Sequence, residues 1–278
     1  MPKAIRALEE LLVQAQERAD RPMEVIARSR LAECWLLRRD EQAAAEALSR
    51  AEEILDRAHT GSFSQYRRVQ ARMAVFTLSG EALRDELTEY VRWADGVCAY
   101  PAFIDGCQLL ADHSDAEQRI YWLERALEVG QQSKTESELG RICTALADAL
   151  DTAGRSEEAL EVYEMALGWH RLKGSMRDQV GACWAIGSVG VRLEDWPLAR
   201  IRLEEGIRLA GNNSSLQDLV ALSLAELAKV NEASGDVIEA RRLVLRAVRL
   251  AREEDLMSSW PKYWMALTKY AGHLDLDV

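Results

Sequence analysis

The sequence is poor in the features that usually mark a catalytic or disulfide-bonded protein. Its 278 residues include only four histidines and five cysteines. It contains no His-x-x-x-His pair and no Cys-x-x-Cys pair, so we predict no metal site. The cysteines are odd in number and lack paired spacing, which agrees with a reducing compartment. We predict no catalytic residues and no cofactor.

Long apolar runs and phosphate-binding loops are also missing. No stretch approaches the roughly 18 apolar residues that a membrane span needs, and the amino terminus is amphipathic, unlike a signal peptide. The segment from Gly130 to Lys134 lacks the glycine that precedes the lysine of a phosphate-binding loop. A net charge of -11 argues against a general nucleic-acid binder, because basic side chains supply most of that affinity. We therefore expect a cytoplasmic protein that binds neither membranes nor nucleic acid directly.

The dominant positive pattern is the helical spacing of small and apolar residues. In residues 140–167 these residues recur from Cys143 to Leu150, Gly154 interrupts them, and Tyr163 belongs to a second series with the same spacing. The segment therefore predicts two antiparallel helices joined by a glycine turn.

This hairpin resembles the tetratricopeptide repeat, which carries Leu-Gly on its first helix and Ala, aromatic, Ala on its second. Leu146-Ala147 takes the Leu-Gly position, and Ala159, Tyr163 and Ala166 take the second-helix positions. The resemblance implies an all-α fold, a right-handed α-solenoid of antiparallel helix pairs. It also implies an inner groove that binds protein segments.

Six helix pairs are predicted within residues 22–255, with a capping helix in 1–19 and another in 258–273, so that 1–278 forms one solenoid. The first packing residue of each second helix falls at positions 44, 83, 119, 159, 199 and 240. These steps exceed the 34 residues of the common repeat. Longer repeats of this kind resemble the helical domains of bacterial regulators of the MalT, Rap and PlcR type.

Local signals predict several helix ends and buried positions. Ser-x-x-Glu/Gln patterns predict capping boxes at helix starts; they lie at Ser114–Glu117, Ser133–Glu136 and Ser214–Gln217. His59 and His170 are expected at helix C-termini, where the helix dipole favours them. Cys143 and Cys183 occupy the same position of successive repeats, so both are predicted to be buried as small hydrophobic residues. Arg119 stands where a small residue is usual, which suggests looser packing there.

In the family that the sequence resembles, the first helix of each pair lines the groove, and residues between its packing positions point inward. Transferred to this sequence, the peptide-binding residues are Arg30, Glu33, Arg68, Arg72, Asp105, Gln108, Arg141, Thr144, Asp148, Trp184, Ser188, Glu226 and Lys229. The arginines of the second and fourth repeats suit a carboxylate or an acidic peptide. Trp184 suits an apolar anchor.

These patterns favour a protein-interaction scaffold or adaptor that holds a peptide or protein segment in its groove. The alternative is a sensory domain that binds a small molecule or signal peptide and controls a transcription factor. An enclosed apolar pocket near Trp169 and Trp184 would favour that alternative. Homo-oligomerisation through the aromatic last helix is a third hypothesis, which requires exposed Trp260 and Trp264. An enzyme is least favoured because no catalytic constellation is present.

Overall fold

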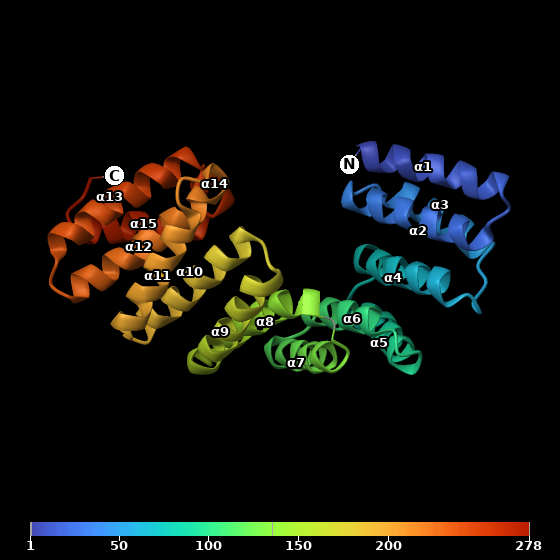
Figure 1. Ribbon diagram of the computed structural model, residues 1–278, viewed down its shortest axis with the longest axis horizontal. Coiled ribbons are helices and arrows are strands. Elements are labelled where there is room, and N and C mark those ends of the chain that lie inside the picture. The colour runs from blue at the N-terminus through green and yellow to red at the C-terminus, as the bar shows by residue number, and fades with distance from the viewer. Residues whose placement is uncertain (1, 135, 278) are drawn as a thin grey trace. The chain divides into compact units, whose positions relative to one another are not determined.

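The computed structural model describes residues 2–134 and 136–277, and all regular elements in these ranges are helices. The chain divides into two compact units, Met1–Thr135 and Glu136–Val278. We call them the N-terminal unit and the C-terminal unit and describe each by itself (Figure 1). The predicted all-α fold is confirmed. The arrangement of residues 1–278 as a single solenoid with two caps stays a prediction.

The N-terminal unit is built from helices that pack on their neighbours in sequence. Its helices are α1 (Pro2–Glu17), α2 (Arg21–Leu37), α3 (Glu41–Glu52), α4 (Thr60–Thr77), α5 (Gly80–Gly96), α6 (Tyr100–Asp112) and α7 (Ala116–Gln132). Helix α2 packs against α1, α3 and α4, while α6 packs against α5 and α7.

The C-terminal unit contains three regular helix pairs, α8/α9, α10/α11 and α12/α13, and each pair packs against the next. Its elements are α8 (Glu136–Thr152), α9 (Ser156–Lys173), α10 (Met176–Arg192), α11 (Trp196–Ala210), the 3₁₀ turn η1 (Ser214–Leu216), α12 (Gln217–Ala233), α13 (Val237–Glu253), α14 (Leu256–Ser259) and α15 (Pro261–His273). This succession of stacked helix hairpins is the tetratricopeptide-like solenoid architecture.

Six of the turns between helices use one backbone motif, in which a residue with left-handed φ ends the preceding helix. In these six turns the residues with positive φ are Ala19, Arg39, Cys98, Gly154, Glu194 and Gly235. The N–H of the following residue donates to the carbonyl five residues earlier, for example Asp40 N to Trp35 O at 3.0 Å. This is the Schellman arrangement, which satisfies carbonyls that a helix end leaves free.

In four of these turns the next residue is an aspartate that caps the following helix. Their side chains accept from backbone N–H groups three residues later; the four are Asp20, Asp40, Asp195 and Asp236. One pair of residues thus ends one helix and begins the next. This places the two helices antiparallel with almost no connecting loop.

Two of the predicted capping boxes, at Ser114–Glu117 and Ser214–Gln217, do not form. Asp115 caps α7 by accepting from Gln118 N at 2.9 Å, while the Ser114 hydroxyl donates to the carbonyl of Leu110. Ser214 begins the 3₁₀ turn and Ser133 ends α7. The residue before α8, at position 135, lies outside the described residues, so the box at Ser133–Glu136 stays a prediction. Beside Ser114 an aspartate takes the cap, and beside Ser214 the asparagine Asn213 does, so the serine pattern alone misplaced these two starts.

A capping box does form at Ser175 and Asp178, where each side chain bonds the backbone N–H of the other residue. The prediction for His59 was wrong. This residue caps the N-terminus of α4, because its Nδ1 accepts from Ser62 N at 3.2 Å. His170 does lie in the last turn of α9.

Small buried residues let the paired helices approach closely. The alanines at the first packing position of α3, α9, α11 and α13 are fully buried; they are Ala44, Ala159, Ala199 and Ala240. In α7 the corresponding Arg119 is partly buried and the next residue, Ile120, enters the core. Cys143 and Cys183 are fully buried as predicted, and burial raises the pKa values of their thiols to about 11 and about 12.

The aromatic residues of α15 mostly face their own unit. Tyr263 donates to the carbonyl of Leu222 at 3.0 Å and Tyr270 donates to Glu232 Oε2 at 2.7 Å, so both are tied to α12. Trp264 packs against the core of the unit, whereas Trp260 is 39% exposed. Self-association through this helix stays a prediction.

Arginine–carboxylate pairs join helices of successive repeats in the C-terminal unit. Arg202 holds Glu164 through two contacts of 2.9 and 2.8 Å. Similar pairs are Arg171–Glu205, Arg177–Asp218 and Arg192–Asp151. The partners lie 34 to 41 residues apart, about one repeat, so these pairs connect each repeat to the next.

We expect Gly187→Ala to destabilise the protein. A Cβ at this position of α10 would lie 2.5 Å from Leu203 Cγ, and Leu203 is fully buried. Overpacking of this kind costs about 1–3 kcal/mol, which exceeds the helix-propensity gain of about 1 kcal/mol. Gly181→Ala is the matched control, because this position of the same helix has open space. Urea denaturation should show a loss for the first variant and a small gain for the second; equal stabilities would contradict the packing.

Candidate functional site

Four of the residues predicted to line a groove form one ion-pair network in the N-terminal unit. Arg72 contacts Glu33 through Nη1, and its Nη2 lies 2.7 Å from Asp105 Oδ1. Arg68 contacts the same two carboxylates at 3.6 and 3.8 Å. The residues come from α2, α4 and α6, so three successive first helices contribute to it.

This network changes the interpretation of Arg68 and Arg72. Two arginines and two carboxylates compensate one another, and the Arg72 guanidinium is largely engaged by Glu33 and Asp105. Although burial acts against the charge, these acids raise the pKa of Arg72. An acidic ligand would have to replace carboxylates that already belong to the chain. We therefore assign the network a structural role that the sequence analysis did not foresee.

We expect Arg72→Met to lower the free energy of unfolding by about 1–3 kcal/mol, because Glu33 and Asp105 lose their nearest charged donor. Arg68→Met is the matched control, since its contacts with both acids are longer. Its loss should be clearly smaller. Chemical denaturation of both variants, with circular dichroism to verify helicity, measures the difference. Equal losses would contradict the ranking of the two arginines.

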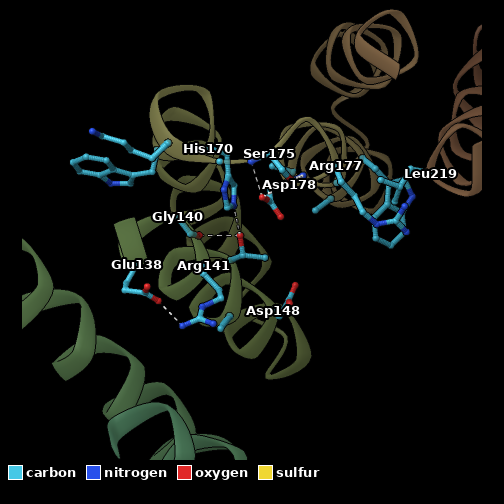
Figure 2. Close-up of a pocket in the computed structure, with 18 of the residues that line it drawn as sticks. Glu138, Gly140, Arg141, Asp148, His170, Ser175, Arg177, Asp178 and Leu219 are labelled. Atoms are coloured by element: carbon cyan, nitrogen blue, oxygen red, sulfur yellow. Dashed lines mark hydrogen bonds and ion pairs between the residues drawn. The ribbon is translucent and has the colours of Figure 1, made fainter. Parts of the chain in front are cut away.

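Four other predicted residues line a pocket of about 710 Å³ in the C-terminal unit: Arg141, Thr144, Asp148 and Trp184. Figure 2 shows the pocket with its labelled side chains. The full lining is Glu136, Glu138, Gly140, Arg141, Thr144, Ala145, Asp148, Trp169, His170, Lys173, Gly174, Ser175, Arg177, Asp178, Gly181, Ala182, Trp184, Ala185, Leu219 and Trp260. The pocket is bounded mainly by α8, α10 and the end of α9. It opens to solvent and combines tryptophans with charged residues.

His170 is held in the wall of this pocket. Its Nε2 lies 3.0 Å from Thr144 Oγ1, and that hydroxyl donates to the carbonyl of Gly140 at 3.0 Å (Figure 2). Because the hydroxyl proton is committed to Gly140, His170 Nε2 must carry the proton that it donates to Thr144. A Cβ at Gly140 or Gly174 would lie 2.8 or 2.7 Å from the imidazole, so both glycines provide space for the ring.

Burial lowers the pKa of His170, while the Asp178 carboxylate opposes part of that shift. His170 is 7% exposed, and its imidazole is neutral at physiological pH because its pKa is lowered. The sequence analysis placed His170 at a helix end but missed its place in the pocket. The two flanking glycines were the available signal, although glycines near helix ends have many other causes.

The charged groups of the pocket are partly paired with one another. Arg141 pairs with Glu138, and Arg177 reaches across to Asp218 of α12. The Asp148 carboxylate accepts from the Tyr163 hydroxyl. Lys173 has no carboxylate partner among the described residues. The wall therefore offers fixed polar groups together with one ammonium group available to a ligand.

Tryptophan side chains form the apolar end of the pocket. The rings of Trp184 and Trp260 are edge-to-face, with centroids 6.1 Å apart. Leu219 belongs to the same lining. The indole N–H of Trp184 is buried and has no hydrogen-bond acceptor among the described residues. Such a donor is costly to leave unpaired, but a nitrogen that is buried to this degree is not accessible to a ligand, so the tryptophan end offers the pocket its rings.

The remaining predicted residues do not join either cluster. Glu226 is 8% exposed and bonds Lys229 Nζ at 2.8 Å, and Ser188 accepts from Arg192 at 3.3 Å. Arg30 is exposed on α2, and Gln108 is partly buried on α6. The thirteen-residue binding surface as a whole stays a prediction.

We expect acidification to weaken the fold through His170. The folded-state pKa lies below the unfolded value, so the unfolded chain takes up the proton first and stability falls as the pH drops below about 6.5. His170→Gln retains a donor for Thr144 but does not titrate. Its melting temperature should therefore fall less than that of the wild type between about pH 7.5 and about pH 5. Parallel curves would contradict this assignment.

Two structural properties bear on the class of site. None of the helices in the described part of the chain has the length and hydropathy required to cross a bilayer. Within residues 2–134 and 136–277, no group of three or more histidine, cysteine, aspartate or glutamate side chains is arranged to hold a metal ion. The pocket must therefore be interpreted from its tryptophans, hydrogen-bonding groups and charges.

Comparison of the sequence with protein-family models finds no match, and comparison with curated proteins finds no relative. Solved structures do match. A signal transduction ATPase with numerous domains from Pyrococcus horikoshii, which has a tetratricopeptide repeat sensor, gives a TM-score of 0.73 at 16% identity. The match covers 91% of this chain and 41% of that protein. This chain thus spans less than half the length of the Pyrococcus protein.

Rap proteins are similar over most of the chain. The apo form of RapI gives a TM-score of 0.60 at 10% identity, covering 90% of this chain and 98% of RapI. A Rap protein complexed with competence and sporulation factor gives 0.53 at 12% identity, covering 92% and 76%. At these identities the similarity establishes the fold. The chain has a tetratricopeptide-like helical-repeat fold that resembles the Rap proteins, as predicted.

Proposed function

We propose that the chain is a protein-interaction module whose C-terminal unit binds an extended peptide or protein segment in the pocket of α8, α9 and α10. The observation that carries this proposal is the pairing of an aromatic end, Trp184 and Trp260, with a wall of fixed polar groups. An apolar side chain of a peptide ligand fits the aromatic end, and the backbone of the peptide fits the polar wall.

The polar groups along the pocket wall support a peptide in particular. Every residue of a peptide except proline carries a backbone N–H and a carbonyl oxygen, so a segment lying along the pocket can pair with the donors and acceptors of this wall. Lys173 adds a cation for a carboxylate side chain or a peptide C-terminus. Arg141, Thr144 and Asp148 follow one face of α8 and provide further donors and acceptors along the same direction.

The competence and sporulation factor bound to a Rap protein provides a precedent for a ligand on this fold. A sensory domain for a small molecule is the second candidate, and the pocket volume lies within the range of such sites. However, the pocket near Trp169 and Trp184 is open and carries charged side chains. The enclosed apolar pocket that would favour the sensory alternative is therefore not what these residues form. We place binding above catalysis because the sequence presents no catalytic constellation.

Selection from a random peptide display library on the purified wild-type protein tests the proposal. Calorimetry with the enriched peptide should then show binding that Trp184→Ala weakens by about 30-fold or more, the loss expected of an aromatic hot spot. Trp184→Phe keeps an apolar aromatic ring but reduces the ring area that a ligand can contact. Its affinity should lie between those of the wild type and the alanine variant.

Trp122→Phe, in α7 of the N-terminal unit, is the matched control and should bind like the wild type. A failure to enrich any peptide, or enrichment that does not depend on Trp184, would contradict peptide binding at this pocket. Screening the same protein with a small-molecule metabolite mixture by thermal shift then tests the sensory alternative. A Trp184-dependent shift there would support it.

A further inference from the structure

Helix α13 presents a basic outer face in a chain whose net charge is -11. One side of the helix is buried in the core of the C-terminal unit. The opposite side exposes Ile238 and Leu245, which are 85% and 47% accessible. It also exposes Arg241, Arg242, Arg246, Arg249 and Arg252. No acidic residue interrupts the five arginines between positions 240 and 252.

The centre of this face is a regular stripe, which we call the α13 stripe: Ile238, Arg242, Leu245, Arg249 and Arg252. Successive members of the stripe are separated by four and then three residues, the spacing by which one helix packs along another. Arg242 lies between the two aliphatic residues, Ile238 and Leu245, and Arg249 and Arg252 follow them. A stripe of this kind is suited to a second helix that packs along it, because each turn of α13 presents either an apolar side chain or an arginine to that helix.

Carboxylates of the chain neutralise this face only in part. Arg242 pairs with Glu239, and Arg241 lies 3.5 Å from Asp275. Arg246 and Arg249 have no ion pair among the described residues. Charge is therefore available at the middle of the helix, beside the exposed Leu245.

The second helices of the preceding repeats show how such arginines are neutralised in this fold. Arg202 of α11 holds Glu164 of α9, and Arg171 of α9 holds Glu205 of α11. In both cases the carboxylate belongs to a neighbouring helix of the same kind. Counted from the first packing residue of each second helix, the positions of Glu164 and Glu205 are taken in α13 by Leu245 and Arg246, so α13 carries no carboxylate there.

We propose that the α13 stripe docks an acidic amphipathic helix of a partner protein, which supplies the missing carboxylates and covers Ile238 and Leu245. Arginine is suited to this role because its planar guanidinium pairs with a carboxylate through two hydrogen bonds. The net charge of -11 disfavours a nucleic acid or an anionic bilayer as the partner. None of the α13 residues lines the pocket, so this inference is independent of the proposed function.

The test uses a designed helical peptide three heptads long, with leucine and glutamate alternating at the four-and-three spacing. Fluorescence anisotropy with the full chain at physiological salt should show saturable binding. Arg242→Glu with Arg249→Glu should weaken it by about tenfold or more, because two attractive charges become repulsive. Arg84→Glu with Arg92→Glu on α5 is the matched control, since both arginines are exposed and have no ion pair among the described residues. It should bind like the wild type.

A peptide of the same composition with the stripe scrambled should bind at least about tenfold more weakly than the designed peptide. Equal binding of the two peptides would overturn the proposal in favour of unspecific charge attraction. Absence of binding, or an equal loss in the α5 control, would also overturn it. Phosphatidylserine vesicles and duplex DNA serve as further probes; stripe-dependent binding to either, without binding to the peptide, would assign the face to that partner instead. Circular dichroism verifies that both double variants remain folded.

Discussion

The left-handed residue between two helices is the constraint on which the rest of this structure depends. It ends a helix within one residue, and the aspartate that often follows begins the next, as at Glu194 and Asp195. Because little chain remains between the helices, they must lie antiparallel and in contact. Alanines such as Ala159 and Ala199 then allow a close approach. The pocket of α8, α9 and α10 exists because this hairpin repeats and presents the same helix face each time.

Glycine is not required for these turns, although it eases them. Gly154 and Gly235 adopt positive φ without strain, whereas Arg39, Cys98 and Glu194 adopt it at a cost of about 1 kcal/mol or more each. The closing hydrogen bond and the cap that follows must offset this cost. This explains why the sequence marked some hairpins clearly, at Gly154, and left others without a visible turn signal.

The fold was predictable because it rests on local periodicity. The helical spacing of small and apolar residues identified the helix pairs and placed Cys143 and Cys183 in the core. Both predictions depend only on which residues share a helix face. Helix ends were less predictable, because a cap depends on a competition between adjacent residues. Ser114 fits the capping pattern, but Asp115 wins the position. His59 shows the same difficulty, since a histidine is rarely expected as an N-cap.

The candidate site was predictable only as far as helix phase determines it. Thr144 and Trp184 line one pocket, and each lies between the packing positions of a first helix, but their binding role stays a prediction. Their phase says nothing about pairing between helices. Arg72 meets Glu33 and Asp105 from segments 39 and 33 residues away, and only the folded chain brings these charges together. The same repeat-length pairing gives the abundant arginines a structural role, because bidentate contacts link one repeat to the next. An arginine that lacks such a partner is therefore more informative about function than one that has it.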